Sequence, residues 1–167
     1  MTSCFSRNEI ESGSSKIKIS MLVDGVLNDK SFNSSANGAL LRLEKDFPEN
    51  IEKFFSATSG VYSSYVPDLD NLKMNGSDLI WLVGYMLTDA SLSVSLENPK
   101  ISYGIIDPAY SDDVRILKKN LIGVVFRIEQ GAFLAGYITT KKSVSGKIDF
   151  IGGVKGGIAD VLYLVAS

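Results

Sequence analysis

A short apolar run, Asp78-Leu79-Ile80-Trp81-Leu82-Val83-Gly84, stands near the middle of this chain. Runs of this length that are apolar on both faces are typical of strands inside a parallel sheet, which helices cover on both sides. Residues 17–23 and 101–106 contain similar runs, and the two segments end at Asp24 and Asp107. The three segments predict the centre of a parallel sheet, with Trp81 in its core.

Helix signals separate these strands. Apolar residues at helical spacing predict a helix over residues 31–47, and residues 63–76 carry the start and stop signals of a second helix. Residues 92–96 alternate like a strand, but a parallel crossover to the strand that follows needs a helix. We therefore predict a third helix there.

Further strands are predicted at residues 52–57, 121–126 and 147–154, with a helix at residues 129–142 before the last of them. The small residues of that helix would let it pack closely on the sheet; they are Gly131, Ala135 and Gly136. Alternation of strands and helices predicts an α/β fold with a doubly wound, mainly parallel sheet, a flavodoxin-like three-layer sandwich. Residues 16–167 are expected to form this one lobe.

Composition narrows the classes of function. The 167 residues include no histidine, which excludes Ser-His-Asp catalysis and histidine-based zinc sites. A net charge of −2 offers no basic surface for nucleic acid, and no apolar run approaches the roughly 20 residues of a membrane-spanning helix. The acidic pair Asp112-Asp113 is typical of a solvated loop. We expect no catalytic residue, no metal site and no cofactor.

The single cysteine is Cys4, in the sequence Thr2-Ser3-Cys4. Bacterial lipoprotein signals end with small residues before the cysteine that receives the lipid, so Cys4 is the predicted lipidation site. The alternative is an ordinary N-terminal thiol. Residues 1–15 are polar and are expected to be a disordered remnant of a lipoprotein tether. The sequence as given shows no hydrophobic signal segment before Cys4, so this chain itself is expected to stay soluble and without a lipid.

Polar residues follow several predicted strands. Ligands of open parallel sheets collect at the carboxyl ends of the strands, where residues 24–33, Gly84-Tyr85, Asp107-Pro108 and residues 152–157 should lie. The first of these places acids, amides and Phe32 before a helix, which is also what a capped helix start needs. Neither a GxGxxG fingerprint nor a P-loop is present, so a dinucleotide or triphosphate site is not indicated.

Four blocks of sequence together resemble the basic membrane protein family, whose spirochaetal members are the most similar. They are residues 24–33, residues 76–84, residues 105–107, and residues 130–137 with 146–148 and 152–153. The resemblance runs from Cys4 to about Gly156. It implies the N-terminal lobe of a type I periplasmic-binding-protein fold, in the substrate-binding lipoprotein of an ABC importer for purine nucleosides.

The resemblance also implies roles for particular residues. Phe32 would stack on the base of adenosine, guanosine or inosine, while Asp24, Asn28, Asn33 and Asp107 would hydrogen-bond base or ribose. No covalent chemistry is expected. The partners would be the ABC permease and its ATPase, and a lipid on Cys4 would hold the protein at the membrane of the cell envelope.

The family's second lobe has no counterpart in this sequence. Residues 158–167 have helical apolar spacing, which suits either a diverged crossover helix or a helix that returns to the lobe after an internal deletion. With one wall of the site absent, a loss of about 4 kcal/mol or more would leave nucleoside binding in the millimolar range or abolish it.

Three alternatives to nucleoside binding remain open at this point. A surface antigen that binds a host matrix protein is the main alternative, because family members lie at the cell envelope. A flavodoxin-like enzyme is disfavoured by the missing histidine and phosphate-binding motifs. The third is a decayed gene product without function.

Overall fold

The computed structural model describes residues 16–110, 119–149 and 151. Within these residues five parallel strands form one sheet in the order β2-β1-β3-β4-β5. The strands are β1 (Ile17–Asp24), β2 (Ile51–Ser59), β3 (Leu79–Val83), β4 (Ser102–Ile106) and β5 (Leu121–Val124). An α/β architecture with a parallel, doubly wound sheet is therefore confirmed.

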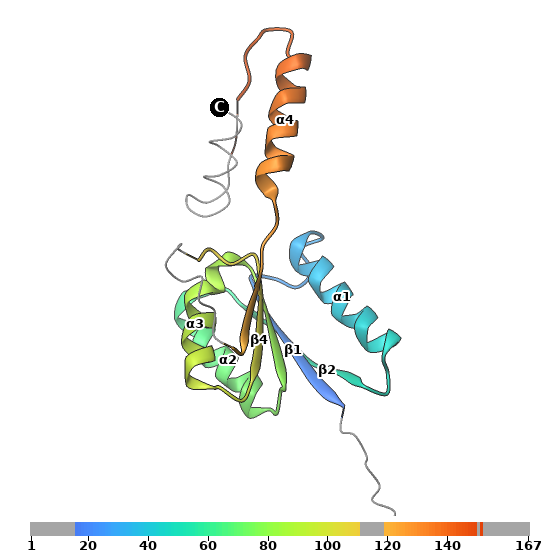
Figure 1. Cartoon of the computed structure of the whole chain (residues 1–167), viewed down its shortest axis with the longest axis vertical. Helices are drawn as coiled ribbons and strands as arrows, with labels where there is room; N and C mark the ends of the chain where they lie inside the picture. The colour runs from blue at the N-terminus through green and yellow to red at the C-terminus, as the bar shows by residue number, and fades with distance from the viewer. Residues whose placement is uncertain (1–15, 111–118, 150, 152–167) are drawn as a thin grey trace, which may run out of the picture.

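Helices cover the two faces of the sheet unequally. They are α1 (Phe32–Asp46), α2 (Tyr65–Met74), α3 (Thr88–Glu97) and α4 (Ile128–Lys142), with short 3-10 turns at Tyr62–Ser64 and Tyr85–Leu87. Figure 1 shows α1 alone on one side of the sheet and α2 with α3 on the other. The segment at residues 92–96 is helical in α3, as the crossover argument required.

Two clusters of apolar side chains stabilise these layers. Because neighbouring strand residues point to opposite faces, Leu22, Leu82 and Ile105 pack against α2 and α3, whereas Met21 and Val23 face α1. The cluster on the α2 and α3 side is the larger of the two. Trp81 was expected in the core, but it is only half-buried and packs against the apolar cluster on the α1 side of the sheet.

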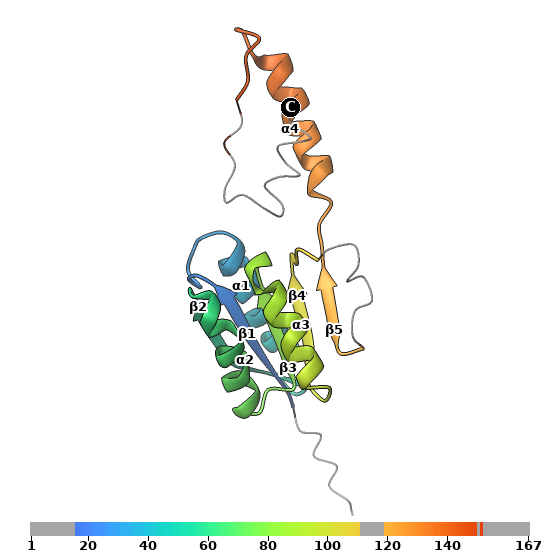
Figure 2. The ribbon, with the colours of Figure 1, turned by 90° about the vertical axis from the view of Figure 1, so that its left-hand side faces the viewer.

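The sequence predicted that the helix at residues 129–142 packs closely on the sheet. This prediction is wrong, because α4 does not lie on the sheet. In Figures 1 and 2 it extends away from the end of the sheet where β5 stops. None of its residues is buried, and a side chain added at Gly131 would meet nothing within 4 Å. The small residues of α4 therefore do not serve close packing on this sheet.

We predicted a sixth strand at residues 147–154, and this prediction is wrong for the residues of that segment that the structure describes. Residues 147–149 and 151 are in no strand. They follow the end of α4 that lies far from the sheet (Figure 1), and they do not pair with β5. The rest of that segment, like Cys4, the tether and the predicted helix at residues 158–167, lies outside the described residues. The fifth strand is also shorter than predicted, since β5 ends at Val124.

The described helices include none that is both long enough and apolar enough to cross a membrane.

Candidate functional site

The carboxyl ends of three neighbouring strands meet at one edge of the sheet. Val23 of β1 pairs with Val83 of β3, which pairs with Ile106 of β4. The residues that follow these three, Asp24, Gly84 and Asp107, are thereby brought side by side. They share a hollow of about 220 Å³, here called the edge pocket, lined by Asp24, Phe32, Asn33, Val83, Gly84, Tyr85 and Asp107.

The loop from β1 to α1 forms one wall of the edge pocket, and Asn33 holds it in shape. The Asn33 side-chain Nδ2 donates hydrogen bonds to the carbonyl oxygens of Asp24, at 2.9 Å, and Val26, at 3.0 Å. Both amide hydrogens are thus used within the loop, and the residue is only 8% exposed. Asn33 therefore mainly supports the loop. Its Oδ1 is the side-chain atom that is left to accept a hydrogen bond from a ligand.

Asp29 closes the start of α1. Its carboxylate accepts hydrogen bonds from the backbone N–H groups of Ser31 at 2.8 Å, Asn33 at 3.0 Å and Ser34 at 3.0 Å. These bonds lower the pKa of Asp29 from 3.8 to about 2, the one from Ser34 contributing most. The helix N-terminus is occupied by the chain's own carboxylate, so it offers little to the phosphate group of a ligand.

Phe32 is the first residue of α1 and the aromatic wall of the edge pocket. Its side chain is 40% exposed, although a phenylalanine at a helix start could have been buried on the sheet. An exposed aromatic face beside carboxylates suits stacking on a flat, neutral ring.

Two carboxylates flank the edge pocket and differ in their surroundings. Asp24 accepts a hydrogen bond from the hydroxyl of Tyr65, from Oη to Oδ1 at 2.8 Å. Asp107 has a left-handed backbone, with φ of 64°, and burial raises the pKa of its carboxyl above the ordinary value of 3.8. The two carboxylates provide acceptors for hydroxyl or N–H groups and make the pocket unfavourable for a phosphate.

The structure brings together four of the five residues that the sequence singled out for the ligand. Asp24, Phe32, Asn33 and Asp107 all line the edge pocket, whereas Asn28 is exposed in the loop and does not line it. Tyr85 also lines the pocket; the sequence placed it at a strand end without giving it a role. Tyr65 was missed altogether, because nothing in its sequence context shows that α2 begins beside the end of β1.

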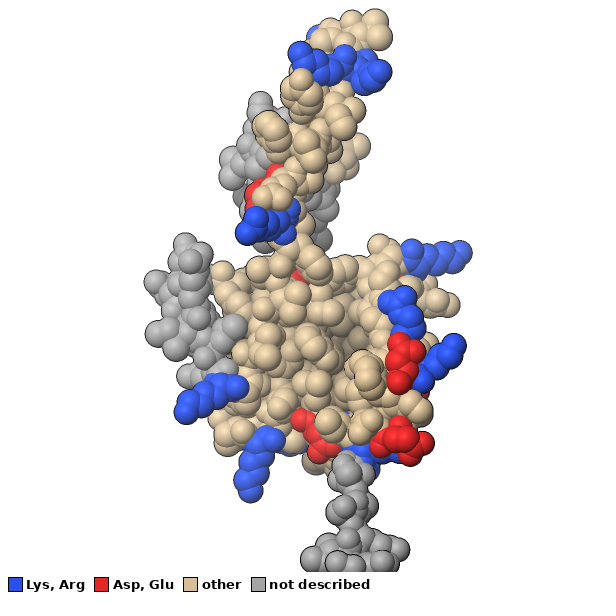
Figure 3. Space-filling model, turned by 45° about the vertical axis from the view of Figure 1, so that its right-hand side comes forward, with Lys and Arg blue, Asp and Glu red and all other residues tan. Residues whose placement is uncertain are grey.

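A larger hollow, the α1 groove, runs between α1 and the sheet. Its volume is about 330 Å³, and its nine lining residues are all apolar: Met21, Ala36, Ala39, Leu40, Leu43, Trp81, Ile106, Val124 and Phe126. Figure 3, turned toward the α1 side, shows a broad face of uncharged side chains with Lys, Arg, Asp and Glu at its margins. Apart from the indole N–H of Trp81, the side chains that line the α1 groove offer no polar group that could orient a solute.

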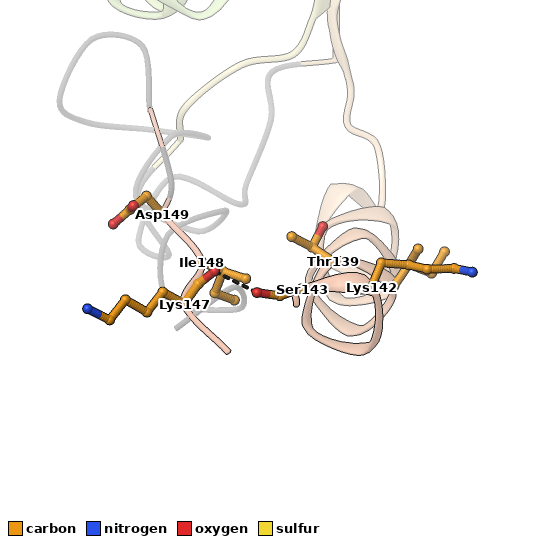
Figure 4. A pocket seen from close by; sticks show the side chains of 7 residues that line it. Thr139, Lys142, Ser143, Lys147, Ile148 and Asp149 are labelled. Atoms are coloured by element: carbon orange, nitrogen blue, oxygen red, sulfur yellow. Dashed lines mark hydrogen bonds between the residues drawn. The ribbon is translucent and has the colours of Figure 1, made fainter. Parts of the chain in front are cut away.

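A third hollow lies beside the end of α4 (Figure 4) and is lined by Ile138, Thr139, Lys142, Ser143, Lys147, Ile148 and Asp149. The charged end of Lys142 points away from those of Lys147 and Asp149, so the three charged groups do not converge on one point. Across the described residues, no three histidine, cysteine or acidic side chains gather in a way that could hold a metal ion. The edge pocket is therefore the candidate ligand site.

Known proteins similar to this chain share one description. A family model named Bmp, the PnrA-like ABC transporter substrate-binding proteins, matches residues 16–162. Basic membrane protein B of Borrelia garinii subsp. bavariensis is 88% identical over 161 residues, covering 96% of this chain and 47% of that protein. Basic membrane protein A of Borreliella burgdorferi is 45% identical over 148 residues, covering 89% of this chain and 42% of that protein. The chain thus spans about half the length of the curated relatives it matches.

Solved structures agree with this assignment. An ABC transporter solute-binding protein from Aeropyrum pernix K1 has a TM-score of 0.61 at 25% identity, over 75% of this chain and 35% of that one. A solute-binding protein from Conexibacter woesei DSM 14684 shares the fold, with a TM-score of 0.57 at 20% identity over 74% of this chain and 39% of that one. The extended family match and the shared fold lead to one conclusion: this chain belongs to the Bmp family of PnrA-like ABC transporter substrate-binding proteins.

Proposed function

We propose that this chain binds purine nucleosides, without chemistry, at the edge pocket, as the N-terminal lobe of an importer's substrate-binding lipoprotein. The observation that carries the proposal is the meeting of one exposed aromatic ring, Phe32, with two carboxylates, Asp24 and Asp107, around a single hollow. A purine matches the ring, and ribose hydroxyls match the carboxylates. Membership of the family supports transport, and the neighbouring carboxylates favour a neutral nucleoside over a nucleotide.

The lobe supplies one wall of such a site. Closed ligand sites bury about 70–90% of a small molecule, whereas the edge pocket is a hollow of about 220 Å³ on the surface of the sheet's edge. The chain on its own is therefore proposed to bind nucleoside in the millimolar range. In the transport assembly the partners would be an ABC permease and ATPase, and a lipid on Cys4 would attach the protein to the envelope membrane.

The test is an amide NMR titration of the 167-residue chain with inosine, adenosine and guanosine. We expect shifts confined to the loop at residues 24–33, to Gly84-Tyr85 and to Asp107, with saturation at millimolar concentration. Inosine monophosphate should cause smaller shifts, because its phosphate would approach the two carboxylates. Shifts elsewhere, or none with any nucleoside, would contradict the proposal. Saturation at micromolar concentration would contradict the claim that one wall binds weakly.

A pair of variants sharpens this titration. Phe32→Leu should weaken inosine binding about 5- to 100-fold, because a base loses its stacking partner. Phe47→Leu is the matched control, since Phe47 is also exposed, at 51%, but directly follows the opposite end of α1. Equal affinity in the two variants would rule out Phe32 as the stacking residue.

A further inference from the structure

We infer that Tyr65 is a positioning residue of the edge pocket, which fixes the carboxylate of Asp24 so that its second oxygen is presented to the ligand. The inference rests on the proposed function, because it assigns to Tyr65 a role in holding a group that would bind nucleoside. Tyr65 itself does not line the pocket.

The contact between the two residues is direct. The Tyr65 hydroxyl donates to Asp24 Oδ1 at 2.8 Å, across 41 residues of sequence. No other described group donates to the Asp24 side chain, so Oδ2 keeps its capacity to accept a hydrogen bond from a ligand. The Cβ of Asp24 also lies at ordinary contact distance, 3.6 Å, from the place where a side chain at Gly84 would begin. Gly84 is thus an immediate neighbour of the Asp24 side chain in the wall of the edge pocket.

The Tyr65 ring is itself held firmly. Tyr65 is 2% exposed and packs in the cluster of apolar side chains between the sheet and α2. The Tyr62 ring meets it edge-on, with centroids 5.6 Å apart and planes at 66°. Tyr62 is anchored in turn to α3, where its hydroxyl donates to Asp89 Oδ2 at 2.9 Å. A ring fixed on two sides can hold a carboxylate in one orientation.

The Tyr65 hydroxyl remains a donor over the physiological range. Burial, followed by the hydrogen bond to Asp24, raises the pKa of Tyr65 to about 12. The phenol therefore stays protonated at neutral pH and donates to the Asp24 carboxylate in a charge-assisted hydrogen bond. Without it the Asp24 side chain would sample several rotamers, and a ligand would have to immobilise it, which weakens binding about 2- to 10-fold.

The first experiment compares Tyr65→Phe with Tyr103→Phe in the full chain. Tyr103 is equally buried, at 2%, but lies in β4 away from Asp24. The readout is the Asp24 χ1 rotamer, from three-bond NMR couplings without ligand, together with the inosine dissociation constant. We expect averaged couplings and 2- to 10-fold weaker binding in Tyr65→Phe, and neither change in Tyr103→Phe.

The outcomes separate this inference from the proposed function. A single Asp24 rotamer in Tyr65→Phe would overturn the positioning role. So would averaged couplings with an unchanged inosine affinity, in which case nucleoside binding would still stand. An unsubstituted chain that shows no inosine-induced shift would remove the proposed function, and the positioning role with it.

A second measurement needs no variant, in case Tyr65→Phe fails to fold. In the unsubstituted chain the Tyr65 hydroxyl proton should exchange slowly with water and show a nuclear Overhauser effect to the Asp24 side chain. A hydroxyl proton that exchanges too fast to be observed would contradict the fixed contact.

Discussion

The edge pocket and the α1 groove lie on the same lobe but are built from different side chains. The groove is the larger, about 330 Å³ against about 220 Å³, and all of its lining residues are apolar. The pocket gathers two carboxylates, an amide and two aromatic rings at the carboxyl edge of the sheet. Between these two hollows, size and apolar lining would favour the groove, since most ligand sites are large and mainly apolar. Orientation of a solute also needs polar groups that converge, and only the pocket has them.

The groove is better explained by the unequal covering of the sheet. Helices α2 and α3 cover one face, while α1 covers only part of the other and α4 extends away from it (Figure 1). The apolar side chains between α1 and β5 are therefore left accessible, with Phe126 54% exposed. The comparison teaches that an apolar hollow can reflect an uncovered surface rather than a ligand site.

The largest effect is expected where the sheet is fully covered. Leu69→Ala removes a side chain that is 0% exposed between α2 and the sheet, and it should lower the free energy of unfolding by about 2–5 kcal/mol. Leu40→Ala is the matched change in the α1 groove, and it should cost about 2 kcal/mol or less, because it enlarges an open groove instead of leaving a closed cavity. Urea unfolding, followed by the fluorescence of the single tryptophan, measures both. Equal losses would mean that the groove is closed in solution.

A smaller effect tests the wall of the groove. A side chain at Gly104 would begin 2.4 Å from the ring of Trp81, so Gly104→Ala must displace that ring. The half-buried ring can move into the groove, and we expect a loss of about 1–3 kcal/mol with a shift in tryptophan emission. In the control Gly38→Ala, on α1, the added methyl meets nothing within 4 Å, so neither loss nor shift should follow. Unchanged emission in Gly104→Ala would mean that Trp81 does not rest on Gly104.

Asp107→Asn tests whether the charged carboxylate of Asp107 lowers the stability of the fold. Burial raises the pKa of Asp107 above 3.8, so folding disfavours the charged form. The resulting destabilisation is absent at pH below about 3.8 and grows as the pH rises through the folded-state pKa. Asparagine cannot ionise and tolerates the left-handed backbone, so the variant should gain stability relative to the unsubstituted chain between about pH 3 and 7. A relative loss over that range would contradict the buried-carboxylate account.

The smallest change in stability is expected at Asp29. Its carboxylate stabilises the fold, whereas the charge on Asp107 destabilises it. Because the pKa of Asp29 is lowered to about 2, its contribution to stability is present above pH 3.8 and is lost as the pH falls toward about 2. Asp29→Asn should therefore be less stable than the unsubstituted chain at neutral pH, with a difference that narrows on acidification. Unfolding curves at a series of pH values provide the check. A difference that stays constant with pH would mean that the carboxylate's charge is irrelevant at the start of α1.

Local patterns were enough to predict most of the lobe. The buried strands β1, β3 and β4 are apolar runs, and the crossover rule correctly predicted a helix at residues 92–96 despite their alternation. The predictions from sequence were wrong for segments whose position depends on the surface against which they pack. Small residues in α4 indicated packing but could not say on which surface, and the strand predicted at residues 147–154 is absent from its described part, which does not pair with β5.

The site shows the same division. The residues next to Val23 and Ile106 could be predicted at the carboxyl edge, because parallel strand ends share one edge. The commitment of the Asn33 amide to two carbonyls and the bond from Tyr65 to Asp24 depend on loop geometry and on where α2 begins. No spacing rule in the sequence encodes such contacts.

The most direct test of the central claim is to locate bound inosine on the full chain by intermolecular nuclear Overhauser effects, at a ligand concentration near saturation. The account predicts contacts from the purine protons to the ring of Phe32 and from the ribose protons to the residues around Gly84 and Asp107. Contacts from inosine to Leu40, Trp81 and Phe126 would instead place the ligand in the α1 groove and contradict the account.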